Sequence, residues 1–262
     1  MAFKCPDGIQ QKLIRAEMHL TEVARALNSF TNGECHLIPE INEELKLMVL
    51  RIDITPKITS QLSAMVGDFL FNARCILDYL VWAIILQAGN TPTAKNMFPI
   101  TSSGENFASQ LKRKRLDGVP VEAVAIIKGL QPCSARNHPL AWLDSLHNVD
   151  KHRELIMTTV VADNTSLDFD GSLSMFLGDE ELYDKAIFGD VGIPLDALGS
   201  EMDRFTNVEV KGEATLFVAF KELSPEAEDL RRVEVLLVLE SILSFIKYDT
   251  LERLIDFATQ SL

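Results

Sequence analysis

The most constraining feature of this sequence is a long apolar run, residues 69–86, that carries two charged side chains near its middle. These are Arg74 and Asp78, four residues apart and therefore on one side of a helix. Such charges are costly inside a bilayer, which argues against a membrane span. We therefore expect a core helix over about residues 58–88, closed by Gly89, and no membrane partner.

The acidic character of the chain is confined to its second part. The formal net charge is −13, but residues 1–155 hold 17 Lys+Arg against 16 Asp+Glu, whereas residues 156–262 hold 8 against 22. Uniform acidity repels phosphate, but a neutral part with local basic clusters need not do so. Nucleic acid is therefore disfavoured for the second part, and RNA binding through residues 1–155 stays open. Within that part, the basic run at residues 112–115 is either a phosphate contact or, more commonly, a solvated helix end.

The cysteines indicate a reducing compartment. Four of them are scattered along the chain without a Cys-x-x-Cys pair, and the first residues lack the apolar stretch of a secretory signal. We therefore expect a cytoplasmic protein. The chain also has no Gly-rich phosphate loop and no His-Glu-x-x-His pattern, so no cofactor is expected.

Hydrophobic periodicity predicts an α+β fold, with a helical bundle, an N-terminal β-hairpin and an antiparallel sheet inserted before a long C-terminal helix. We expect one domain over residues 1–262, made of a mainly helical part (1–155), an acidic antiparallel β part (156–222) and a closing helix (223–262). Within it, helices are expected at residues 9–30, 58–88, 105–115, 120–129 and 139–155, the hairpin at 35–41 and 45–54, and sheet strands at 157–161, 173–176, 205–210 and 214–221.

Residues 146–153 are the most chemically loaded segment of the chain. On a helix, Asp150 and Arg153 lie three apart on the apolar face, whereas Asn148 and His152 lie four apart on another face. Because a buried charge needs a partner, the charged side chains of this segment and of residues 69–86 are expected to meet.

We predict that they form a cross-helix clasp, in which Arg74 pairs with Asp150, and Asp78 with Arg153 or Lys151. One interpretation is an ion-pair network that fixes the register of two helices, because paired internal charges are commonly structural.

A functional interpretation makes the same cluster an active or binding site. In it, Arg74 neutralises an anion, and His152 or His147 transfers protons near neutral pH. A metal site is not expected, because His147 and Asp150 have no well-placed third ligand. The surrounding residues expected to bind a ligand are Asp78, Asn148, Asp150, Lys151 and Arg153.

The order of several motifs resembles a widespread family of uncharacterised bacterial proteins. The motifs are Arg-Cys-Ile-Leu-Asp at residues 74–78, Phe-Pro-Ile at 98–100 and Asn-Val-Asp-Lys-His-Arg at 148–153. The resemblance covers about residues 8–156. It implies a bacterial or phage origin and brings no established activity with it.

A second resemblance is to the HEPN superfamily of helical ribonucleases and nucleotide-binding domains. Their motif is an arginine, often followed by asparagine, and then a histidine after four to six intervening residues. Here His147, Asn148 and His152 have that spacing, with histidine at the arginine position. The resemblance implies catalysis at His152 and His147, with Arg74 or Arg153 in place of the arginine, and a site built across a dimer.

Two functions are therefore expected. The first is a non-enzymatic intracellular binding protein, with a buried Arg/Asp/His cluster and an unknown protein partner or a second copy of itself. The second is a HEPN-like ribonuclease or nucleotide-binding enzyme, in a toxin or anti-phage role. Solvent access separates them, because an active site needs His147 or His152 to line a cleft with Arg74 nearby.

Overall fold

The computed structural model describes most of the helical residues and part of the remaining backbone. The described residues are 6–31, 34–42, 46–55, 58–132, 138–152, 155, 157–161, 165–169, 173–177, 187–194, 216–221, 230 and 233–255. Side chains are described at 6–28, 46, 58–132, 138–152, 155, 157, 218–221, 230 and 233–255.

The chain divides into two compact units. The first contains residues 1–24, 60–156 and 220–262, and the second contains residues 25–59 and 157–219. The expectation of a single domain stays a prediction. The helices are α1 (Asp7–Thr31, within the first unit as far as Ala24), α2 (Ser60–Gln87), α3 (Gly104–Lys112), α4 (Val121–Gly129), α5 (Pro139–His152), α8 (Val235–Ser244) and the π-helical η3 (Phe245–Leu251).

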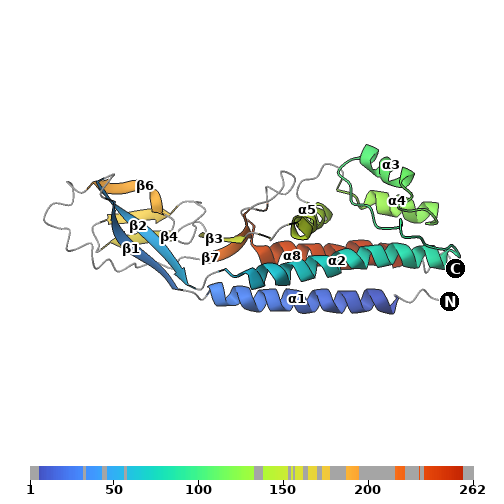
Figure 1. The fold of residues 1–262 in the computed structure, drawn as a ribbon, viewed down its shortest axis with the longest axis horizontal. Coiled ribbons are helices and arrows are strands. Elements are labelled where there is room, and N and C mark those ends of the chain that lie inside the picture. The colour runs from blue at the N-terminus through green and yellow to red at the C-terminus, as the bar shows by residue number, and fades with distance from the viewer. Residues whose placement is uncertain are drawn as a thin grey trace. The chain divides into compact units, whose positions relative to one another are not determined.

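Helix α2 forms the centre of the first unit. Its buried side chains lie on several sides, and within the unit it runs alongside α1 and α8 (Figure 1). It is the one helix in the described part of the chain that is long and apolar enough to cross a membrane, and 61% of its most apolar window is buried by the protein itself. Core helices of packed bundles show the same composition. The expected helix over residues 58–88 is confirmed within two residues at its start, and it ends before Gly89, whose φ of 75° is typical of a helix stop.

The segment between α2 and α4 folds back over the second half of α2 (Figure 1). Helix α3 begins where the Ser103 side chain accepts a hydrogen bond from the backbone N–H of Asn106 at 3.2 Å, the usual cap of a helix start. In the turn between α3 and α4, Gly118 has a φ of 84° and lies against Ile85, so both its backbone conformation and the space around it favour glycine. The loop of residues 90–103 is thereby held against α2.

The α+β fold class predicted from the sequence is wrong. Helices account for 72% of the residues whose side chains are described, and these residues hold only one short strand and no sheet. Neither the expected β-hairpin nor the expected antiparallel sheet is seen among them. The chain is therefore described as mainly helical.

The strand backbone of the second unit explains why the prediction failed. In the segments for which mainly the backbone is described, β1 (Glu34–Asn42) pairs with β2 (Leu47–Thr55) and β2 with β6 (Ile187–Pro194). There too, β4 (Thr165–Phe169) pairs with β5 (Leu173–Leu177), and β3 (Met157–Val161) with β7 (Leu216–Phe220). Among the strands that the structure describes, the pairing thus gives three small groups, not one sheet before the final helix. Alternating residues favour extended chain, but they do not determine which strands pair.

Candidate functional site

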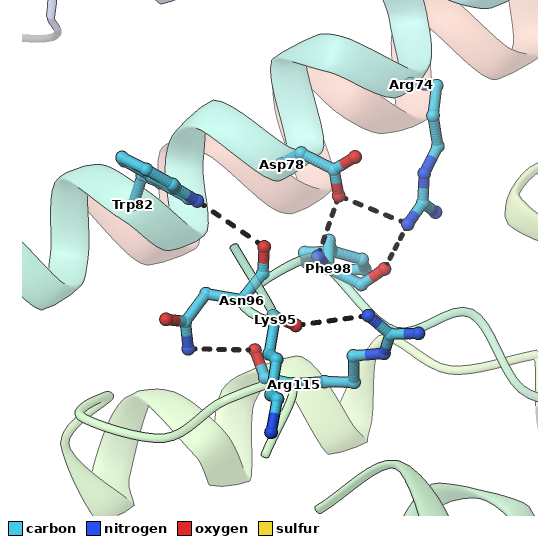
Figure 2. Close-up of polar contacts among 7 residues, drawn as sticks. All are labelled: Arg74, Asp78, Trp82, Lys95, Asn96, Phe98 and Arg115. Carbon is cyan, nitrogen blue, oxygen red and sulfur yellow. Dashed lines mark hydrogen bonds and ion pairs between the residues drawn. The ribbon is translucent and has the colours of Figure 1, made fainter. Parts of the chain in front are cut away.

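Arg74 and Asp78 hold the backbone of Phe98, an arrangement we call the Phe98 clamp. The Asp78 carboxylate accepts the Phe98 N–H at 2.8 Å, and the Arg74 guanidinium donates to the Phe98 carbonyl (Figure 2). The two side chains also pair with each other, Nη2 to Oδ1, at 3.1 Å. They lie one helical turn apart on α2, so the spacing in the sequence aims both at one loop.

The predicted clasp is not formed as expected. Arg74 pairs with Asp78 of its own helix, and the part of the chain that the structure describes shows no ion pair between Arg74 and Asp150. Asp150 lies instead against Gly67 of α2, at the point where α5 crosses it. Lys151 is exposed, and Arg153 lies outside the described residues.

Asn96 organises the same loop and was not among the site residues predicted from the sequence. It is 5% exposed; its Oδ1 accepts the Thr93 N–H at 2.6 Å, and its Nδ2 donates to the Asp117 carbonyl at 2.9 Å. The indole N–H of Trp82 donates to the Asn96 carbonyl at 3.4 Å (Figure 2). An asparagine in a polar loop gives no signal of this role, because the role depends on the fold around it.

A groove of about 580 Å³ runs between α3 and α5 of the first unit. Asp144, Asn148 and His152 line it from α5 at intervals of four residues, and Asn106 and Gln110 line it from α3 at the same interval. Its wall is completed by residues 100–102, which follow the Phe98 clamp directly. The clamp therefore fixes the position of one wall of this α3–α5 groove.

The charge in this groove belongs to Asp144, which was also not among the site residues predicted from the sequence. Burial raises the pKa of its carboxyl group, while the positive charges of Arg74 and Lys151 and a hydrogen bond from Asn148 oppose the shift. That bond joins Asn148 Nδ2 to Asp144 Oδ2 at 3.2 Å. The charge of Arg74 thus acts on Asp144, which lies one and a half turns before the predicted partner Asp150 on α5.

His147 lies under the surface of α5, not in the groove. It is 5% exposed, and burial is the main cause that lowers its pKa to about 4, followed by the charges of Lys151 and Arg74. The imidazole is therefore neutral near pH 7. His152, by contrast, is exposed and lines the groove.

The buried His147 should make the protein sensitive to acid. Because its folded-state pKa is below its ordinary value of 6.5, the stability that depends on the neutral ring is present above about pH 6.5 and is lost as the pH falls toward 4. We expect this one group to reduce the free energy of unfolding by about 2 kcal/mol between pH 7 and pH 5. The measurement is urea unfolding at both pH values.

The matched variant for this measurement is His147→Leu. Asp144 and Asp150, whose carboxyl pKa values are both raised mainly by burial, act in the opposite direction but are present in both proteins. The difference between wild type and variant therefore isolates His147. An identical pH dependence in the two proteins would contradict the prediction.

The structure thus divides five of the predicted site residues among three places. Asn148 and His152 lie in the α3–α5 groove, Arg74 and Asp78 form the Phe98 clamp, and Asp150 packs on Gly67. No group of three or more His, Cys, Asp or Glu side chains suited to hold a metal occurs in the part of the chain whose side chains are described.

Comparison of the chain with family models, with curated proteins and with solved structures gives no match.

Proposed function

We propose that this chain is a binding protein that takes an extended segment of a partner polypeptide into its α3–α5 groove. The observation that carries the proposal is the pair of polar rows, Asn106 and Gln110 on α3 and Asp144, Asn148 and His152 on α5, that face one groove. Side-chain amides both donate and accept hydrogen bonds, which suits them to the alternating N–H and C=O groups of a peptide backbone.

The length of the groove agrees with this occupant. Its α5 wall extends from Ala141 to His152, which is about 16 Å along a helix axis. An extended chain rises about 3.3 Å per residue, so the wall accommodates about five residues of a partner. A volume of about 580 Å³ is also within the range of sites that bury a small ligand.

The chemistry of the cluster supports binding more than catalysis. His147 is neutral and buried, and Nη2 of Arg74 is committed to the Phe98 backbone and to Asp78. A neutral buried ring is poorly placed to donate a proton, and a guanidinium engaged in the fold has less capacity to hold a reacting anion.

A screen of displayed random heptapeptides on the purified chain tests this proposal. Enriched peptides should lose about tenfold in affinity with Asn148→Leu or Gln110→Leu, because each change removes hydrogen bonds to the peptide backbone. Lys128→Gln, an exposed change on α4, is the control and should bind as the wild type does. Peptides that bind both groove variants unchanged would refute the proposal, as would a screen without enrichment.

A second candidate function is a HEPN-like ribonuclease, and the observation in its favour is that Asn148 and His152 are both exposed and line the groove together. Its test is the cleavage of varied RNAs by wild type and by His152→Ala, with folding checked by circular dichroism. Cleavage that disappears with His152→Ala would favour the nuclease over the binding protein. Absence of cleavage by the wild type would exclude it.

A further inference from the structure

A second groove, of about 450 Å³, lies between α1 and α2 and shares no residue with the α3–α5 groove. It lies wholly within the first unit, where α1 and α2 run side by side (Figure 1). Its polar lining includes Lys12, Arg15 and Asp68, and its aromatic lining consists of Phe71 and Tyr79.

Lys12 is held in place in this α1–α2 groove by two contacts. Its ammonium donates to Asn72 Oδ1 at 3.0 Å and lies 4.9 Å from the centroid of the Phe71 ring. Asn72 is 7% exposed, and its own amide donates to the Asp68 carbonyl at 2.7 Å. A buried side chain therefore positions the cation, so little conformational entropy would be lost when an anion binds to it.

The aromatic wall of the groove also takes part in the contact between α1 and α2. Tyr79 is 44% exposed and lies against Gly8, where an added Cβ would approach its ring at 3.3 Å. Phe71, two turns earlier on α2, is 53% exposed. One face of the groove thus offers aromatic surface to solvent next to a fixed cation.

The charges of the groove favour a ligand with a single negative charge. Lys12 and Arg15 lie three apart on α1 and line the same groove, while Asp68 contributes one carboxylate opposite them. The imidazole of His19, which also lines the groove, pairs with Glu22 of its own helix at 3.2 Å. Two cations against one exposed carboxylate suit a carboxylate ligand better than a doubly charged phosphate.

We propose that the α1–α2 groove binds a small aromatic carboxylate. Its carboxylate pairs with Lys12 and Arg15, and its ring packs against Tyr79. The volume of the groove is in the range of small-ligand sites. Asn72 is a positioning residue, because it acts on the ligand only through Lys12.

The probe for the first experiment is 3-phenylpropanoate, titrated into the purified full chain by isothermal calorimetry or ligand-observed NMR. We expect it to bind about tenfold more tightly than the neutral 3-phenylpropanamide, because the amide has no charge for Lys12. It should bind about threefold more tightly than 3-cyclohexylpropanoate, which lacks an aromatic face. Equal affinity for carboxylate and amide, or no binding of 3-phenylpropanoate, would overturn the proposal.

Variants locate the site of binding. Lys12→Gln should lose about tenfold in affinity for 3-phenylpropanoate, and Tyr79→Leu should abolish its preference over the cyclohexyl probe. Lys128→Gln is the matched control, because it removes an exposed lysine outside the groove. Unchanged binding by a folded Lys12→Gln protein would refute the assignment. Asn148→Leu should keep this binding, so the result is independent of the proposed peptide groove.

Discussion

Asp78→Ala is expected to reduce the free energy of unfolding by about 3 kcal/mol. The carboxylate accepts the Phe98 N–H at 2.8 Å and pairs with Arg74 at 3.1 Å. Its removal leaves the backbone N–H without this acceptor and leaves a guanidinium that is only 13% exposed without its counter-charge. We expect less than the full cost of breaking a buried pair because Asp78 itself is 32% exposed. Urea unfolding at pH 7 measures the change.

Two further variants test whether the effect belongs to the Phe98 clamp. In a double-mutant cycle with Arg74→Ala, the two changes should cost less together than the sum of each alone, because they remove one shared network. Asp117→Ala is the control, since its pair with Lys114 is 3.8 Å long and both side chains are about two-thirds exposed. That change should stay within about 0.5 kcal/mol. A similar small loss for Asp78→Ala would show that the clamp does not stabilise the fold.

Gly67→Ala is the second change with a large expected effect, a net loss of about 2 kcal/mol in the free energy of unfolding. A Cβ at position 67 would overlap the carboxylate of Asp150, so α2 and α5 must separate or Asp150 must turn. The intrinsic preference of helices for alanine over glycine offsets only about 1 kcal/mol of this loss in the free energy of unfolding. Thermal and urea unfolding measure the difference.

A substitution at Asp150, the residue that contacts position 67, should restore the stability lost in Gly67→Ala. In an Asp150→Gly background, Gly67→Ala should be neutral or stabilising, because the overlapping carboxylate is gone. Gly129→Ala on α4 is the control for helix propensity, since no neighbouring atom lies within 4 Å of its added Cβ. Gly129→Ala should not destabilise. Loss of stability by Gly67→Ala in both backgrounds would mean that Asp150 is not the cause.

Two residues on the α5 side of the α3–α5 groove were predicted to share a face, but the groove itself and its charged residue were not predicted. The spacing of Asn148 and His152 places them together on one face of a helix, and both line the groove. Asp144 lies one turn earlier on the same side, yet its raised pKa arises from burial that no local pattern reveals. His147 shows the opposite case, because its motif suggested catalysis and its burial lowers its pKa to about 4.

The sequence by itself determined that α2 is a core helix with Arg74 and Asp78 on one side, because residue spacing sets the direction of each side chain around a helix axis. Only the tertiary structure decided what those side chains meet. Asp150 reaches α2 at Gly67, seven residues and about 10 Å before Arg74 along the axis, so the charges expected to pair do not. The offset between two packed helices depends on the shapes of both surfaces and the loops that join them, and periodicity within either helix contains no information about it.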